Sequence, residues 1–186
     1  MSPRKVRPSR RYPDPAAQPL VEIVAKTMRR LRAGPTEHAE QMALAYQVRT
    51  HLDRFPLLRL FTAIPNAEQS KAQAGKKWAE GVEAGYPDTL LDSPRAGYCG
   101  LRIELKRSSY WPATALEPQR KGLPTVEQLE WHQRLTEQGY LVAVSWGWEP
   151  AWKLIRWYIS QGHTFGVDFP RMPPPDARLR YHGRSP

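Results

Sequence analysis

Cysteine is nearly absent from this chain, which has one, Cys99, among its 186 residues. A single cysteine excludes an intramolecular disulfide, and the five scattered histidines form no zinc-type ligand cluster. No apolar run approaches the roughly 18 residues of a membrane span, and the basic N-terminus lacks the apolar stretch of a signal peptide. We therefore expect a cytoplasmic protein with no membrane partner.

Acidic residues are also in the minority, since 18 Asp and Glu stand against 28 Lys and Arg, for a formal net charge of +10. This excess favours a polyanionic partner, because phosphate neutralisation is the largest sequence-independent contribution to nucleic-acid binding. The length and the 40% hydrophobic content suit one domain with extensions. We expect a disordered basic arm at 1–18, the domain at 19–165 and a tail rich in proline and arginine at 166–186. The arm either tracks DNA phosphates or only aids solubility.

Hydrophobic periodicity and turn residues predict alternating helices and strands. Helices are expected at 19–32, from a Thr36 cap to about residue 53, from 125 to 139 and at 149–160, and the polar stretch 67–83 is a further helical candidate. Strands are expected at 57–64, 89–92, 101–106 and 141–144, with a hairpin joining the second to the third. This order indicates an α/β protein with a central mixed sheet flanked by helices.

The expected strand at 101–106 carries the most informative pair of residues, Glu104 and Lys106. Alternation along a strand allows three apolar side chains to enter the core while Arg102, Glu104 and Lys106 line the other face. Glu104 and Lys106 should be about 6 to 7 Å apart, which leaves room for a metal-bound water and a scissile phosphate. The site requires a second carboxylate, and Asp88, in the turn at 85–88, is the candidate.

Hydrolysis of a phosphodiester needs an activated water, neutralisation of negative charge and help for the leaving oxygen, and oxygen-bound Mg²⁺ or Mn²⁺ can serve all three. Asp88 and Glu104 would hold the ion. Lys106 would position or deprotonate the water, or stabilise the phosphate in the transition state. A Glu-x-Lys sequence alone is more often only the solvated face of a strand. The preceding turn with Asp88, the connecting hairpin and the basic charge favour a catalytic site instead.

Five features in order, over about residues 36–160, resemble the virus-type replication-repair nuclease (VRR-NUC) branch of the PD-(D/E)xK nuclease superfamily. They are Glu37 with Gln41, Pro65-Asn66, Gly85-x-Pro87-Asp88, Glu104-x-Lys106, and Gln128 followed by Trp131 and Gly139. The chain departs from the branch after Asn66, where residues 67–71 replace a glycine-rich turn that leads to an arginine. Lys71 is the candidate substitute for that arginine.

The resemblance implies a restriction-endonuclease-like fold and a Mg²⁺- or Mn²⁺-dependent endonuclease. Asp88, Glu104 and the Leu105 carbonyl would be metal ligands, and Glu37, rather than Glu40, would reach the metal directly or through water. Lys106 would be catalytic. Gln128 would orient the lysine or a phosphate, and the alternative is a polar residue that faces solvent at the start of a helix.

Stand-alone members of the branch, of phage or bacterial type, resemble Holliday-junction resolvases and act as homodimers, so the resemblance implies branched or double-stranded DNA as the substrate. Alternatives are a restriction-like or nicking nuclease and a non-catalytic nucleic-acid-binding module. Candidate nucleic-acid contacts are Lys71, Lys76, Lys77, Arg107, Tyr110 and Trp111. The tryptophans that are candidates for either a dimer interface or the core are Trp146, Trp148, Trp152 and Trp157.

Overall fold

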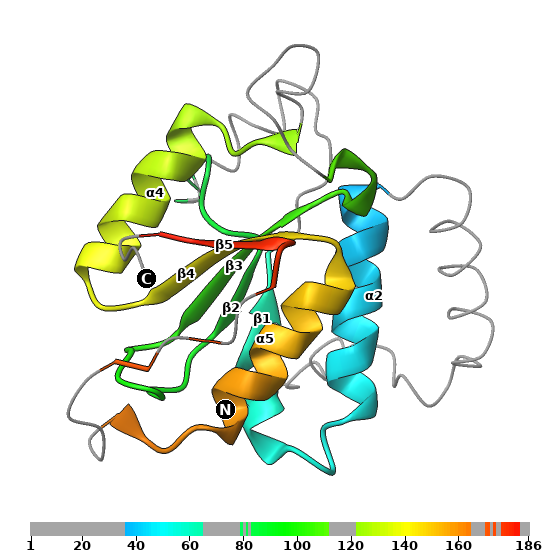
Figure 1. Cartoon of the computed structure of the whole chain (residues 1–186), viewed down its shortest axis with the longest axis vertical. Coiled ribbons are helices and arrows are strands. Elements are labelled where there is room, and N and C mark those ends of the chain that lie inside the picture. Colours follow the sequence, from blue (N-terminus) through cyan, green and yellow to red (C-terminus); the bar gives the residue numbers. More distant parts are fainter. Residues whose placement is uncertain are drawn as a thin grey trace, which may run out of the picture.

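The fold is a mixed sheet of five strands flanked by helices (Figure 1). The computed structural model describes residues 36–64, 79, 81, 83–111, 122–164, 170–171, 173 and 176–182. The predicted basic arm, the predicted helix at 19–32, the Pro65-Asn66 pair and the three lysines at 71, 76 and 77 lie outside the described residues. Among the helices of the described part, none is long and apolar enough to cross a membrane.

The strands follow the chain in spatial order, β1-β2-β3-β4-β5. Their bounds are β1 (Phe61–Ala63), β2 (Thr89–Leu91), β3 (Leu101–Lys106), β4 (Leu141–Trp146) and β5 (Leu179–Tyr181). The β3–β4 pair is parallel, with Lys106 opposite Trp146, and all other neighbours are antiparallel. The predicted hairpin between β2 and β3 is present. Because a parallel pair needs a crossover, the intervening helix crosses one face of the sheet.

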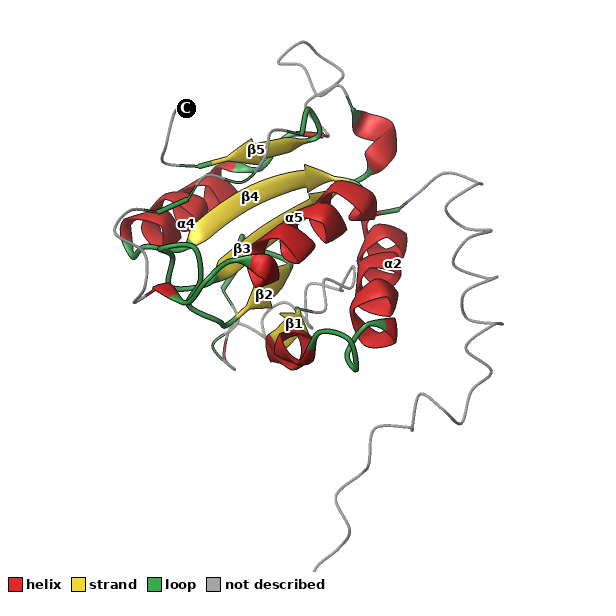
Figure 2. Ribbon diagram, turned by 60° about the horizontal axis from the view of Figure 1, so that its bottom comes forward, coloured by secondary structure: helices red, strands yellow, loops and turns green. Residues whose placement is uncertain are grey.

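The helices form a layer on each face of the sheet. Helices α2 (Glu37–Thr50) and α5 (Trp148–Ser160) pack against each other and against β3 on one face, while α4 (Val126–Glu137) covers the other (Figures 1 and 2). The main apolar core lies beneath α2 and α5 and includes Leu44, Leu101, Ile103, Leu105, Ala143 and Ile155. The other face of β3 is the polar face, and it is turned toward α4.

Side-chain caps begin helices α2 and α4. The Thr36 hydroxyl accepts a hydrogen bond from the backbone N–H of Ala39 (3.1 Å), as its position predicts. Thr125 and Gln128 form a reciprocal capping box at the start of α4. Helix α5 begins after Gly147 (φ 103°), which has no side chain for capping.

Glu40 supplies the cap of α5 from a different helix. Its carboxylate, 1% exposed, accepts hydrogen bonds from the backbone N–H groups of Trp148 (3.0 Å) and Ser108 (3.1 Å). The second bond ties α2 to the short 3₁₀ helix η3 (Ser108–Tyr110), which follows β3 directly. Glu40 is therefore a structural carboxylate that holds the carboxyl end of β3 between α2 and α5.

The predicted strand at 57–64 is wrong in part. Residues 57–60 of the predicted strand belong to a 3₁₀ helix, η2 (Pro56–Leu60), and only Phe61–Ala63 pairs with β2. Pro56 occupies the first turn of η2, where its fixed φ suits a helix. An apolar run of this length does not distinguish a strand from a buried turn of helix. In α4, the apolar Val126 (69% exposed) and Leu129 (43% exposed) face solvent.

The strand β5 (Leu179–Tyr181) is not predicted from the sequence. It lies within the region predicted as a tail rich in proline and arginine, and it pairs antiparallel with β4, Arg180 opposite Val144. Three residues with an arginine in the middle carry too little hydrophobic periodicity to predict a strand. The C-terminal region therefore contributes one of the two edge strands of the described sheet, and β1 is the other.

Candidate active site

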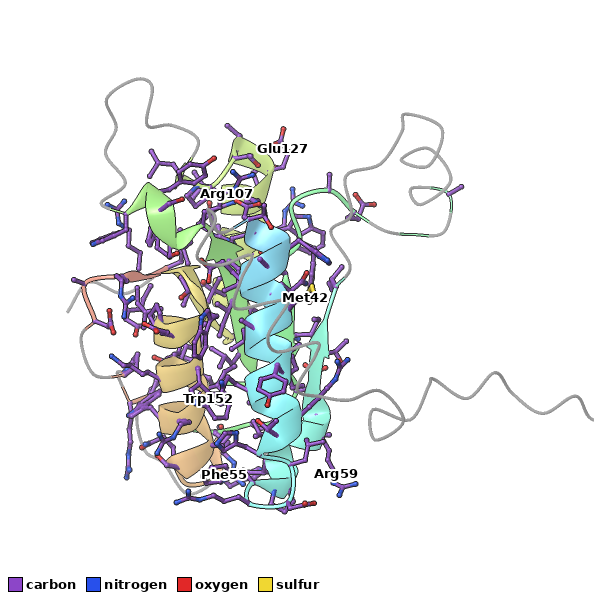
Figure 3. The ribbon with its side chains drawn as sticks, turned by 90° about the vertical axis from the view of Figure 1, so that its right-hand side faces the viewer. Met42, Phe55, Arg59, Arg107, Glu127 and Trp152 are labelled. Atoms are coloured by element: carbon purple, nitrogen blue, oxygen red, sulfur yellow. The ribbon has the colours of Figure 1, made fainter. Side chains whose placement is uncertain are left out.

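The carboxyl end of β3 brings together side chains that are far apart in the sequence. Glu104 and Lys106 come from β3, Asp88 from the turn before β2, Gln128 from the first turn of α4 and Glu37 from the first turn of α2. Figure 3 shows this end of the molecule, where Arg107 and Glu127, the chain neighbours of Lys106 and Gln128, lie near the first turn of α2. The structure thus places five of the predicted site residues in one region.

Lys106 is held by a carboxylate and an amide. Its Nζ donates to Glu104 Oε1 (3.0 Å) and to Gln128 Oε1 (3.1 Å), and Gln128 Nε2 also donates to Glu104 Oε1. The predicted gap between carboxylate and ammonium is wrong, because the two side chains lean together and form an ion pair. The pairing follows from burial, since Glu104 is 1% and Lys106 5% exposed and charges removed from water require a partner.

One oxygen of Glu104 has no partner in the described part of the chain. Burial, with the Asp88 carboxylate adding to it, raises the pKa of Glu104 to about 8, although the Lys106 ammonium opposes the change. Its Oε2 is buried and has no hydrogen-bond partner within the described residues. An ionised carboxylate in this position would be stabilised by a cation at Oε2.

Asp88 lies beside the backbone of Leu105. Its Oδ2 accepts from the Leu105 N–H (2.7 Å), just beyond the last β2–β3 pair, Thr89 opposite Ile103. In a strand the N–H and C=O of one residue point toward the same neighbour, so the Leu105 carbonyl is directed to the Asp88 side of β3. The Lys106 carbonyl points the other way, where it accepts from the Gly147 N–H (3.0 Å).

This set of oxygens suits a hard cation such as Mg²⁺. The described residues contain no group of three or more His, Cys, Asp or Glu arranged to hold a metal ion. Mg²⁺ needs no such cage, because it is commonly bound by one or two carboxylates and completes its shell with water and substrate phosphate. Glu37 is 47% exposed and 3.9 Å from Lys106 Nζ, so in this structure it approaches the lysine.

Gln41 fixes the turn that carries Asp88. Its Nε2 donates to the carbonyl of Ile64 (2.7 Å), at the end of β1, and also approaches the Asp88 carbonyl (3.4 Å). The amide therefore links α2, β1 and the Asp88 turn. This contact gives a physical reason for a glutamine one helical turn after Glu37, a spacing that the sequence shows only as a pattern.

Gly85 allows the turn to touch α4. Its φ is 86°, and a Cβ there would lie 2.6 Å from the Glu127 carbonyl carbon and 2.8 Å from the Gln128 nitrogen. Any other residue would therefore be strained in its backbone and would push α4 away. The next residue, Tyr86, packs edge to face on Trp131 of α4 (5.1 Å between ring centroids). The glycine of the turn thus brings Asp88 and Gln128 to the same site.

The remaining nucleic-acid candidates follow β3. Arg107, Tyr110 and Trp111 are all half-buried, with Arg107 over the Tyr110 ring (5.4 Å) and Trp111 against Trp146 (5.1 Å). The tryptophans considered for an interface belong largely to the core, because Trp146 is 0% exposed and Trp152 is 9% exposed. Trp148 and Trp157 are partly buried against the main core.

A solved structure named as a VRR_NUC domain protein is similar to this chain. The two share 27% sequence identity and superpose with a TM-score of 0.55, and the match covers 74% of this chain and 99% of the other. No protein-family model and no curated protein matches the chain. The similarity therefore extends over essentially the whole of the solved domain and includes its α/β nuclease-like fold.

Proposed function

This chain carries a VRR-NUC nuclease domain, and on that premise we propose that it is a Mg²⁺- or Mn²⁺-dependent DNA endonuclease that cleaves four-way junctions or related branched DNA. The observation that carries the proposal is the cluster of Asp88, Glu104 and Lys106, all buried, with the partly buried Gln128, in which Glu104 Oε2 has no hydrogen-bond partner among the described residues. An inert fold would lose little by replacing these costly buried charges with apolar residues.

In this proposal Asp88, Glu104 and the Leu105 carbonyl would hold the metal ion, and Glu37 would reach it directly or through water. When bound, the ion lowers the pKa of a water molecule and neutralises charge on the phosphate. Glu104 must be ionised to act as a ligand, so metal binding has to displace the proton that burial favours. In this proposal Glu104 Oε1 is held by Lys106 and Gln128, while Oε2 is the oxygen available to the cation.

Lys106 is the proposed catalytic lysine. Its Nζ lies between Glu104 and Gln128, and it has two alternative roles: to orient or deprotonate the attacking water, or to stabilise the charge on the phosphate. Gln128 limits the freedom of Nζ from α4, and its own side chain is fixed by the Thr125 backbone N–H (2.9 Å). Gln128 thereby acts as a positioning residue.

Three arguments support branched DNA as the substrate. The net charge of +10 favours a phosphate backbone. The described elements contain no helix-turn-helix for reading bases, which favours recognition by shape. A homodimer, part of the same proposal, would present two sites to a junction that itself has two-fold symmetry.

The test compares labelled four-way junction, splayed arm, flap, single strand and plain duplex, each with Mg²⁺, Mn²⁺ or EDTA. Wild type is assayed beside Asp88→Asn and Glu104→Gln, with Glu130→Gln as the matched control, because Glu130 is exposed on α4 and pairs only with Arg134 (3.3 Å) among the described contacts. We expect paired, metal-dependent incisions of the junction that both site variants lose and the control retains.

Other outcomes would refute parts of the proposal. Equal cleavage of all substrates would leave a nuclease without selectivity for structure. Incision of plain duplex on one strand would favour a nicking enzyme. Tight DNA binding without cleavage in any metal would favour a non-catalytic binding module.

A further inference from the structure

Arg102 is a buried arginine on the polar face of the sheet, and the proposed mechanism does not use it. It lies on β3 two residues before Glu104, so both side chains point to the same face, and it is 5% exposed. A guanidinium remains charged in proteins, and a charge removed from water needs partners. The partners of Arg102 therefore indicate what it holds in place.

The Arg102 guanidinium connects the two ends of β2. Its Nε donates to the Tyr86 hydroxyl (3.1 Å), before the strand, and its Nη2 pairs with Asp92 (2.8 Å), directly after the strand. Arg102 itself stands opposite Leu90, the middle residue of β2. The guanidinium carbon lies 4.2 Å from the centroid of the Tyr140 ring. Because the guanidinium is planar and rigid, these contacts fix the direction of the bond to Tyr86.

Tyr86 belongs to the turn that carries Asp88. It precedes Asp88 by two residues, and its ring packs edge to face on Trp131. Asp88 is 5% exposed, so the path of this turn sets the position of its carboxylate. The turn is held from two sides, because Gln41 approaches the Asp88 carbonyl from α2 (3.4 Å) and Arg102 binds the Tyr86 hydroxyl on the polar face.

We propose that Arg102 is a positioning residue for the metal site and that it acts through the Tyr86 hydroxyl on the Asp88 carboxylate. This inference rests on the proposed nuclease function, in which Asp88 would be a metal ligand. A ligand that is already held in its binding position loses little freedom when the cation binds, and the partners behind metal ligands commonly change metal affinity about 10- to 100-fold. Because Arg102 is buried, its effect should fall on the metal and not on the DNA.

The test uses Tyr86→Phe, with Asp92→Asn as the matched control. Each substitution removes or weakens one partner of the same guanidinium, and the phenylalanine keeps its ring on Trp131. Mn²⁺ is titrated into the full chain without DNA, and the free ion is measured by electron paramagnetic resonance. Cleavage is then measured over a range of Mg²⁺ concentrations. Urea denaturation in EDTA measures stability separately.

We expect Tyr86→Phe to weaken Mn²⁺ binding about 10-fold and to raise the Mg²⁺ concentration for half-maximal cleavage by the same factor. At saturating Mg²⁺, kcat and the KM for DNA should return to wild-type values, because the hydroxyl contacts neither the reacting groups nor the DNA in this proposal. Asp92→Asn should bind Mn²⁺ like wild type. A purely structural role of the contact would instead lower stability in urea and leave the affinity for Mn²⁺ unchanged.

Arg102→Lys tests whether Arg102 and Tyr86 act as one unit. The lysine keeps a positive charge for Asp92 but cannot reproduce the guanidinium fork. The double variant, Tyr86→Phe with Arg102→Lys, should bind Mn²⁺ as weakly as Tyr86→Phe alone, because both changes remove the same contact.

The outcomes separate this inference from the proposed function. Unchanged Mn²⁺ affinity in Tyr86→Phe, or an equal loss in Tyr86→Phe and Asp92→Asn, would overturn the inference, while cleavage by wild type would leave the nuclease function intact. Tyr86-dependent Mn²⁺ binding by a protein that cleaves no DNA would refute the proposed function and support the inference. A wild-type protein that binds no Mn²⁺ would overturn the inference together with the proposed metal dependence.

Discussion

The stability of the metal-free protein should fall as the pH rises, because of Glu104. Burial raises the pKa of this carboxyl from 4.5 to about 8. A carboxyl with a higher pKa in the folded state binds its proton more tightly when folded than when unfolded. Its contribution to stability is therefore fully present below pH 4.5 and is lost as the pH rises to about 8.

The size of the effect follows from that interval. At about 1.4 kcal/mol per pH unit, the range from 4.5 to about 8 sets an upper limit of about 5 kcal/mol on the loss. That interval already includes the opposing effect of the Lys106 ammonium, 3.0 Å away, and water entering the site as Glu104 ionises reduces the loss further. We therefore expect a loss of about 2 to 3 kcal/mol between pH 5 and pH 8.

The assay is urea denaturation in EDTA at half-unit pH steps from 5 to 9, for wild type, Glu104→Gln and the surface control Glu130→Gln. Subtracting the Glu104→Gln curve from the wild-type curve removes the titration of all other groups. The difference in the free energy of unfolding should therefore show the loss that is due to Glu104 alone. Excess Mg²⁺ should flatten the wild-type curve, because the cation stabilises the ionised carboxylate and binds only the folded site. Parallel wild-type and Glu104→Gln curves in EDTA would refute the assignment of the titration to Glu104.

Three further substitutions test the elements that hold the site together. Gly85→Ala should cost at least about 2 kcal/mol in urea denaturation and should lower kcat, because the new Cβ pushes against the backbone next to Gln128; unchanged kcat would contradict this. Glu40→Ala should cost about 2 to 4 kcal/mol, since it leaves two backbone N–H groups without their acceptor; a loss below 1 kcal/mol would contradict the capping role. Gln41→Leu should weaken Mg²⁺ binding about 10-fold in titration calorimetry by releasing the Asp88 turn, and unchanged affinity would show that the turn is held elsewhere.

Much of the fold could be predicted because its signals are local. Thr36 and Thr125 cap their helices, and the alternate apolar residues of β3, Leu101, Ile103 and Leu105, enter the main core as predicted. The β2–β3 hairpin follows from the turn residues between two short apolar runs. Each of these features depends on residues that are close in the sequence, where propensity and periodicity are informative.

The missed features depend on long-range packing. Strand β5 exists because the edge of β4 is available to pair with it, and no pattern within Leu179–Tyr181 indicates that partner. The burial of Glu40 is equally invisible, because its two hydrogen-bond donors, Ser108 and Trp148, come from other elements. A glutamate in the first turn of a helix ordinarily faces solvent near the helix dipole.

The candidate site was predictable as a set of residues but not as a geometry. Spacing along β3 could place Glu104 and Lys106 on one face, yet the distance between their charges depends on α4, which covers that face and removes water from it. The separation along the strand therefore gave no information about the ion pair at 3.0 Å. The distance between two charged side chains on a strand depends on the helix that covers them. The position of that helix is set by tertiary packing and not by the local sequence.

Three residues that support the site without performing chemistry, Gln41, Gly85 and Gln128, explain why the site needs several motifs at fixed spacing. Asp88 is held in place by Gln41 from α2, and Gly85 admits the first turn of α4, from which Gln128 reaches Lys106. Without Gln41, Gly85 and Gln128, a Glu-x-Lys strand would place the same charges on an open surface, where water would screen them. The pKa of Glu104 would then not be raised, and the lysine would not be fixed. The specificity of the sequence pattern therefore comes from the glutamines and the glycine as much as from the charged residues.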